Sequence, residues 1–122
     1  MTAIGRLKTR AEFLRVREGT RFAAPSLVLQ ARARLPESKE AANVARFGFT
    51  ASKALGNAVA RNRARRRLKE AVRLIAPQHA REGYDYVLIA RAGTLQRLFT
   101  DLTKDLERAL GKVHQAPRPR PG

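Results

Sequence analysis

The organising segment of this chain is Arg61-Asn62-Arg63-Ala64-Arg65-Arg66-Arg67-Leu68-Lys69, in which six of the nine residues are basic. At about 100° per residue, this segment and its continuation place a set of apolar residues in one sector. These residues are Ala64, Leu68, Ala71, Val72 and Ile75. Asn57 is a good N-cap residue, and Pro77 is a stop signal. The pattern therefore predicts an amphipathic helix from about Asn57 to Ile75.

The polar side of this helix is densely basic. Beside the apolar stripe lie Asn62, Arg65, Arg66, Lys69 and Arg73, and the stripe is flanked by Arg61 and Arg67. Between Lys53 and Arg73, eight cations meet a single carboxylate, that of Glu70. Binding to a polyanion relieves such self-repulsion. The pattern therefore favours nucleic-acid binding over the alternative, a helix face that is merely solvated.

Composition points the same way. The 122 residues carry a formal charge of +16, and the pI is near 11.7. We expect one RNA-binding domain over residues 1–113 and a disordered, basic, proline-rich tail over residues 114–122. The absence of cysteine excludes disulfides and thiolate metal sites. No stretch is long and apolar enough for a membrane span, so the cytoplasm is the expected compartment and no membrane partner is expected.

The rest of the chain reads as alternating short elements. Apolar spacing predicts helices over residues 9–17 and 94–110, the second ended by Gly111. Strands are predicted over residues 26–34, 44–50 and 84–91, and residues 35–43 resemble a hairpin-type connection. The expected fold class is α+β: an α-β sandwich of three helices on one small, mostly antiparallel sheet.

The sequence contains no recognisable protein active site. His79 and His114 are far apart, and the carboxylates are too scattered for a two-metal site. Phe47 and Phe49 alternate as core residues should, whereas Phe13 and Phe22 suit either the core or base stacking. We therefore expect no catalytic residue, no metal ligand and no small-molecule substrate on the protein itself.

One long motif is specific to a known family. It reads Arg46-Phe47-Gly48-Phe49-Thr50-Ala51-Ser52-Lys53-Ala54-Leu55-Gly56-Asn57-Ala58-Val59-Ala60-Arg61-Asn62-Arg63. This resembles the signature of the bacterial ribonuclease P protein subunit, in which a Ser-Lys-x-x-Gly-x-Ala-Val segment leads into an Arg-Asn-Arg helix. Residues 6–13 and 84–91 fit the family as well, so the likeness covers about residues 6–111.

The resemblance implies a fold similar to domain 2 of ribosomal protein S5, with a left-handed βαβ crossover. It also implies an accessory subunit of an endonuclease that removes the 5′ leader of precursor tRNA. The catalyst would be an RNA that binds Mg²⁺, with one protein per catalytic RNA. By motif match, the residues at that RNA are Ser52, Lys53, Asn57, Arg61, Asn62, Arg63, Arg65, Arg66 and Lys69, to which the helix pattern adds Arg73.

The resemblance further implies a cleft for the single-stranded leader, between the sheet and the first and central helices. Phe13 matches an aromatic residue of that cleft, whereas Arg17 and Gln30 replace aromatic residues common in the family. Leader binding is therefore expected to rest more on cations, and Phe22 is a candidate compensating ring. The alternatives are a basic ribosomal or ribosome-assembly protein and a nonspecific DNA-binding architectural protein.

Overall fold

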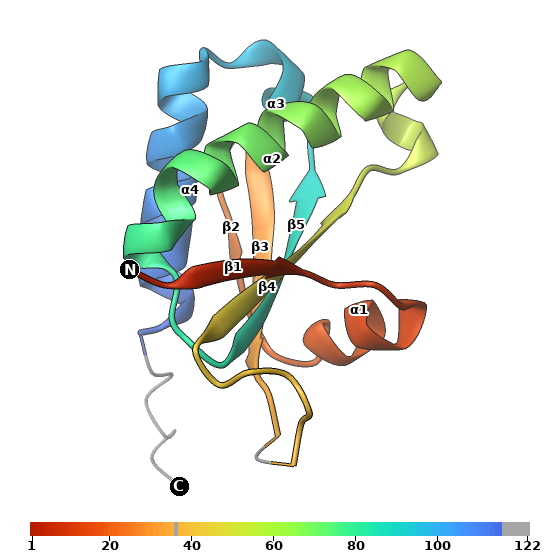
Figure 1. The fold of residues 1–122 in the computed structure, drawn as a ribbon. Helices are drawn as coiled ribbons and strands as arrows, with labels where there is room; N and C mark the ends of the chain where they lie inside the picture. The colour runs from red at the N-terminus through yellow and green to blue at the C-terminus, as the bar shows by residue number, and fades with distance from the viewer. Residues whose placement is uncertain (36, 116–122) are drawn as a thin grey trace, which may run out of the picture.

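A computed structural model describes residues 1–35 and 37–115. In it one five-stranded sheet is covered by helices on both faces (Figure 1). The elements in chain order are β1 (Ala3–Arg6), α1 (Arg10–Val16), β2 (Thr20–Ala23), β3 (Leu27–Ala33), β4 (Val44–Thr50), the 3₁₀ turn η1 (Lys53–Leu55), α2 (Ala58–His79), β5 (Tyr84–Ala90), α3 (Ala92–Gln96) and α4 (Phe99–Val113). The described residues thus form an α+β sandwich, as predicted, with four α-helices rather than three.

The sheet is mixed and has the strand order β1-β4-β5-β3-β2. β4 pairs in parallel with β1 and β5, while β3 pairs antiparallel with β5 and β2. The expectation of a mostly antiparallel sheet was therefore wrong. The hairpin expected over residues 35–43 was also wrong, because β5 lies between β3 and β4. β5 is nearly apolar throughout and is buried on both faces, which suits a central strand.

The unit β4–α2–β5 joins two neighbouring parallel strands through the central helix. It forms a left-handed crossover, in agreement with the ribosomal protein S5-like fold. α2 begins as predicted at Asn57, whose side-chain Oδ1 accepts a hydrogen bond of 2.9 Å from the Ala60 N–H. The apolar stripe of α2 is buried at Ala64, Leu68, Ala71 and Val72.

Pro77 does not stop α2, which continues to His79. A proline removes one helical hydrogen bond, and the carbonyl that Pro77 leaves without a helical donor is that of the exposed Arg73. The N-terminal segment also holds the last turn. The Thr2 N–H donates to the Pro77 carbonyl at 2.8 Å, and the Thr2 hydroxyl donates to the Ala80 carbonyl at 3.0 Å. These contacts explain why the helix outlasts its stop signal.

The last predicted helix is two helices, with extended backbone at Arg97 and Leu98. Three contacts hold this break. Arg67 of α2 donates from Nε to the Thr94 carbonyl at 2.7 Å and also binds the Arg97 carbonyl, and the Arg97 Nε lies 3.1 Å from Asp105. Leu98, which lies within the range predicted for that helix, is 72% exposed, and Gly111 lies inside α4 rather than after it.

The core lies mainly between the sheet and the α2–α4 layer. It contains Leu27, Leu29, Phe47, Tyr86 and Leu88 from the strands, and Leu68, Leu102, Leu106 and Leu110 from the helices. A smaller cluster of Leu7, Val16 and Val87 lies under α1 on the other face. Among the described residues, no helix is both long and apolar enough to cross a membrane.

Two short edge strands, β1 and β2, were not predicted, because four residues carry too little periodic signal. The C-terminal end also differs from the expectation. His114, assigned to the disordered tail, caps α4 and its ring contacts Tyr84 and Tyr86. Residues 116–122 of that predicted tail lie outside the described residues.

Candidate RNA-binding surfaces

A groove of about 600 Å³ runs between α1 and the sheet. One wall comes from α1 and the residues before it, and the floor comes from β3, β4 and β5. The lining residues are Lys8, Thr9, Arg10, Phe13, Leu14, Arg17, Arg21, Gln30, Phe49, Thr50, Val87 and Ile89. These include four cations and no carboxylate, so the groove suits an anionic chain with apolar parts.

The shape of the groove depends on Gly48. A Cβ atom added at Gly48 would lie only 2.4 Å from Cζ of Phe13, so the missing side chain lets the Phe13 ring lie directly on β4. α1 itself begins with a capping box, in which Thr9 accepts from the Glu12 N–H and Glu12 accepts from the Thr9 N–H. A short helix is thereby started and held close to the strand.

Three of the four residues expected in the leader cleft line this groove: Phe13, Arg17 and Gln30. Phe22 does not. It pairs with Leu29 across β2 and β3 and packs on the core side, where the Arg108 guanidinium lies 5.7 Å from its ring centroid. Its neighbour Arg21 pairs with Gln30 and lines the groove instead. Predicting β2 would have revealed this, because alternate strand residues face opposite sides.

The central helix does not border the groove, although the resemblance implies that it should. α2 lies on the opposite face of the sheet, where its buried residues, Leu68 among them, pack into the main core. None of the residues of α2 lines the groove. The groove instead ends near Thr50, from which the chain leads through η1 to the start of α2. The groove and the basic face of α2 are therefore linked by this connection and do not share one cleft.

The connection carries Ser52 and Lys53, both exposed. Gly56 has φ of 140°, a conformation that strongly favours glycine, and this sharp bend leads directly into the Asn57 cap. Arg61 donates to the Gly56 carbonyl at 3.0 Å and so also braces the turn. The predicted loop residues are thus brought beside the first turn of α2.

The predicted basic face of α2 is exposed to solvent over several turns. Arg63, Arg66 and Lys69 are exposed, and Arg65 donates to the Asn62 side chain at 2.8 Å. Arg73 is partly neutralised by an ion pair with Glu70, which lowers the pKa of the Glu70 carboxyl. Arg67 has a structural role instead, because its guanidinium donates hydrogen bonds to the carbonyls at the α3–α4 break.

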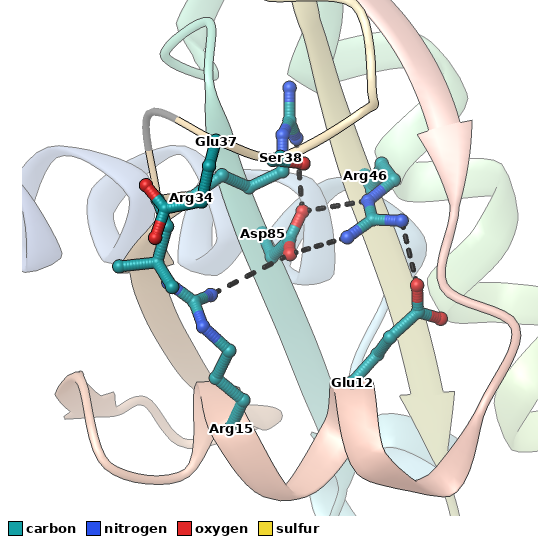
Figure 2. A pocket seen from close by; sticks show the side chains of 8 residues that line it. Glu12, Arg15, Arg34, Glu37, Ser38, Arg46 and Asp85 are labelled. Atoms are coloured by element: carbon teal, nitrogen blue, oxygen red, sulfur yellow. Dashed lines mark hydrogen bonds and ion pairs between the residues drawn. The ribbon is translucent and has the colours of Figure 1, made fainter.

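A second charged cluster, shown in Figure 2, lies beside α1 around a cleft of about 170 Å³ and was not predicted. We call it the Asp85 network. Asp85 is 2% exposed and receives two hydrogen bonds from Arg46, of 2.9 and 2.8 Å, and one of 3.0 Å from Arg34. Arg46 also donates to Glu12 at 2.7 Å. No sequence signal links these residues, which come from α1, from β4 and β5, and from the residue that follows β3.

The network shifts the pKa values of Glu12 and Arg46. Burial acts to raise the pKa of the Glu12 carboxyl, but backbone donors at Lys8 and Thr9 together with Arg46 hold it below the ordinary value of 4.5. The pKa of Arg46 is raised, chiefly by its hydrogen bonds to Asp85. Both of these groups are therefore charged at neutral pH. Within residues 1–35 and 37–115, no three histidine or acidic side chains gather as a metal site.

Comparison with known proteins identifies the family. The ribonuclease P family model matches residues 1–114. This chain belongs to the ribonuclease P protein family. The ribonuclease P protein component of Ruegeria pomeroyi is 50% identical over 119 residues, covering 97% of this chain and 92% of the relative. That of Paramagnetospirillum magneticum is 50% identical over 111 residues, covering 90% and 83%.

Solved structures agree with the fold. The ribonuclease P protein of Staphylococcus aureus superposes with a TM-score of 0.70 at 27% identity, covering 89% of this chain and 94% of that chain. The protein from Thermotoga maritima has a TM-score of 0.68 at 23% identity, covering 92% and 97%, and supports the fold alone.

A ribonuclease P protein is a subunit of the holoenzyme that cleaves tRNA precursors, and the family implies a partner RNA subunit. Membership in the family therefore favours this function over the ribosomal and DNA-binding alternatives.

Proposed function

We propose that this protein binds two RNAs at once, the catalytic RNA of ribonuclease P and the single-stranded 5′ leader of precursor tRNA. The basic face of α2 and the connection before it would contact the catalytic RNA, and the groove beside α1 would hold the leader. The observation that carries the proposal is the existence of two separate cationic surfaces, on opposite faces of one sheet.

The groove is suited to a single strand of RNA. Its four cations, Lys8, Arg10, Arg17 and Arg21, stand on both sides of an apolar floor that includes Val87 and Ile89. Stacking of an unpaired base on an aromatic ring contributes about 1–3 kcal/mol. Because Arg17 and Gln30 replace family aromatics, we assign most leader affinity to phosphate contacts, with Phe13 as the main stacking ring.

The α2 face is suited to folded RNA. Arg65 and Arg66 project from a rigid helix that is anchored by a buried stripe, so their spacing is fixed before RNA arrives. Arginine presents several donors in a planar fork that matches phosphate oxygens. The exposed N–H groups at the start of α2 add a favourable site for a further phosphate.

The proposed role is to assist cleavage. Hydrolysis of the phosphodiester is assigned to the RNA subunit and its bound Mg²⁺. The protein would reduce phosphate repulsion between the two RNAs and so lower the Mg²⁺ concentration that cleavage requires. It would also favour precursor over mature tRNA, because only the precursor has a leader to bind. We further propose one protein per catalytic RNA, acting in the cytoplasm.

The first test is reconstitution with a catalytic ribonuclease P RNA at low Mg²⁺, following 5′ cleavage of precursor tRNA. The wild-type protein is expected to stimulate cleavage. The triple variant Arg61→Ala, Arg65→Ala and Arg66→Ala should bind the RNA about tenfold more weakly while staying folded. The matched control removes the same charge from α4, as Lys104→Ala, Arg108→Ala and Lys112→Ala. Equal behaviour of the two triple variants would contradict the assignment of the α2 face.

The second test addresses the groove. Affinity of the holoenzyme is measured for precursor tRNA with a long leader and for mature tRNA. Arg17→Ala with Arg21→Ala should reduce the preference for precursor, because two leader phosphate contacts are lost, and should leave affinity for the catalytic RNA unchanged. If the preference survived this double change, the leader would bind elsewhere.

A further inference from the structure

The position of α1 is held by a small set of contacts, although this helix forms one wall of the groove. α1 has seven residues, and only Val16 among them is buried. Beneath it the apolar cluster contains Leu7, Val16 and Val87, joined by the partly buried Phe13 and Ile89. So short a helix on so small a cluster needs a further restraint to keep one orientation.

Glu12 supplies that restraint with a single carboxylate. Its Oε1 accepts hydrogen bonds from the backbone N–H groups of Lys8 and Thr9, at 2.6 and 2.8 Å, which closes the first turn of α1. Its Oε2 accepts from the Arg46 Nη1 on β4 at 2.7 Å, which ties the same turn to the sheet. Glu12 therefore both caps the first turn of α1 and anchors that turn to the sheet.

The anchor is itself rigid. Arg46 is 8% exposed and binds Asp85 of β5 through Nε and Nη2, while Arg34 binds Asp85 from the end of β3. Arg34 further donates to the Val44 carbonyl and, at 2.9 Å, to the Ala41 carbonyl. Charge-assisted, bidentate bonds of this kind fix direction as well as distance. Glu12 thus binds the Arg46 guanidinium, whose orientation is fixed by its bonds to Asp85.

A second tie lies one helical turn further along α1. Arg15 donates to the Ala33 carbonyl at 2.6 Å, and its Nη1 lies 3.9 Å from Asp85. Glu12 and Arg15, three residues apart, face the Asp85 network, as Figure 2 shows. Phe13 and Arg17, four residues apart, line the groove on the other flank of the helix. A rotation of α1 would move both sets together.

We propose that Glu12 is a positioning residue for the groove. Through Arg46 and Asp85 it sets the orientation of α1, and with it the separation of Phe13 and Arg17 from Gln30 and Arg21 on the sheet. The Asp85 network thereby controls how well the groove binds single-stranded RNA without touching that RNA. This inference rests on the proposed leader-binding function.

The test uses Glu12→Gln. The amide oxygen can still accept from the Lys8 and Thr9 N–H groups, so the capping box remains. The amide nitrogen then faces Arg46 as a donor, and the tie to the sheet is lost. The matched control is Glu18→Gln, which removes the same charge just after α1 from a more exposed pair with Arg32, 3.4 Å apart.

The readout is the ratio of holoenzyme affinities for precursor tRNA with a long leader and for mature tRNA. Glu12→Gln should lower this ratio by about fivefold and leave affinity for the catalytic RNA unchanged, whereas Glu18→Gln should change neither. If wild type discriminates and Glu12→Gln discriminates equally well, the positioning role is wrong. If wild type shows no preference for the leader, the proposed function itself fails.

A milder variant tests the same positioning role with less risk that the protein unfolds. Arg15→Lys keeps the charge but loses the reach of the guanidinium, and it should lower the affinity ratio in the same direction by a smaller factor. Amide hydrogen exchange should then rise in α1 and stay unchanged in β3 and β5. Faster exchange throughout the sheet with an unchanged affinity ratio would show that the network serves stability alone.

Discussion

At the scale of single residues, neighbouring arginines in one basic run perform different tasks. Arg66 is exposed on α2, whereas Arg67 caps the Thr94 and Arg97 carbonyls and lies 5.8 Å from the centroid of the Phe99 ring. One step along a helix turns a side chain by about 100°, which here separates solvent from a helix junction. Charge alone therefore does not identify which arginines are available for the proposed RNA contacts.

Replacing Arg67 by alanine is expected to lower the free energy of unfolding by about 1–3 kcal/mol, because two carbonyls lose their charged donor. Arg66→Ala should change it by less than about 0.5 kcal/mol while weakening RNA binding. Urea denaturation of both variants makes the comparison. A fully stable Arg67→Ala protein would contradict the structural role.

His114 is expected to make stability depend on pH. Burial, with a smaller contribution from the Arg81 charge, lowers the pKa of His114 from 6.5 to about 4. As pH falls from 6.5 towards 4, the unfolded chain binds a proton that the native protein does not, so stability decreases. Above pH 6.5 this contribution is constant.

The check is an NMR titration of the His114 ring together with urea unfolding at about pH 7 and pH 5. In His114→Gln the loss of stability between these two pH values should be smaller than in wild type. A ring that titrates near 6.5 would show that His114 is not enclosed by Tyr84 and Tyr86.

At the scale of elements, α1 and β4 form the groove together by close approach. Phe13 lies where a side chain on β4 would stand, so the helix and the strand depend on the absence of a Cβ atom at Gly48. The small cluster of Leu7, Val16 and Val87 then closes beneath the helix. A steric change in the strand is therefore transmitted to the groove wall.

Gly48→Ala is expected to destabilise the protein by about 1–3 kcal/mol, because the added methyl group overlaps the Phe13 ring and forces α1 to shift. The preference for leader-bearing tRNA should fall as well. Gly111→Ala is the control, since a Cβ atom there has open space around it. An unaltered groove in Gly48→Ala, seen as unchanged stability and leader preference, would contradict this packing.

At the scale of the whole molecule, the charge of +16 is distributed over both faces of the sheet. The groove cations lie on the α1 side, and the α2 arginines lie on the other. In the proposed complex, this arrangement would let one small protein reduce repulsion between the two RNA segments that it separates. The folded chain therefore presents its positive charge on two opposite faces of the sheet rather than in a single patch.

Binding to the catalytic RNA should depend steeply on salt. Each phosphate neutralised contributes about 0.7–0.9 to the slope of log affinity against log salt concentration. Removing Arg61, Arg65 and Arg66 should reduce the slope by about 2–3, whereas removing Lys104, Arg108 and Lys112 should leave it unchanged. Filter binding across a salt series measures both. Equal slopes would mean that the RNA contacts both helices alike.

The sequence by itself determined the features that arise within one element. β4 from Val44 to Thr50, the Asn57 cap and the buried stripe of α2 follow from side-chain period and capping chemistry, which act over a few neighbouring residues. The family motif likewise lies in one continuous stretch. These features were predictable because local backbone geometry dictates them.

Only the tertiary structure decided how the elements meet. The insertion of β5 between β3 and β4, the break at Arg97, the turn of Phe22 away from the groove and the Asp85 network all join residues far apart in the chain. Each depends on which strands pair and which charges are buried together. Such pairing leaves no periodic trace in a single sequence, because its partners are chosen by packing of the whole molecule.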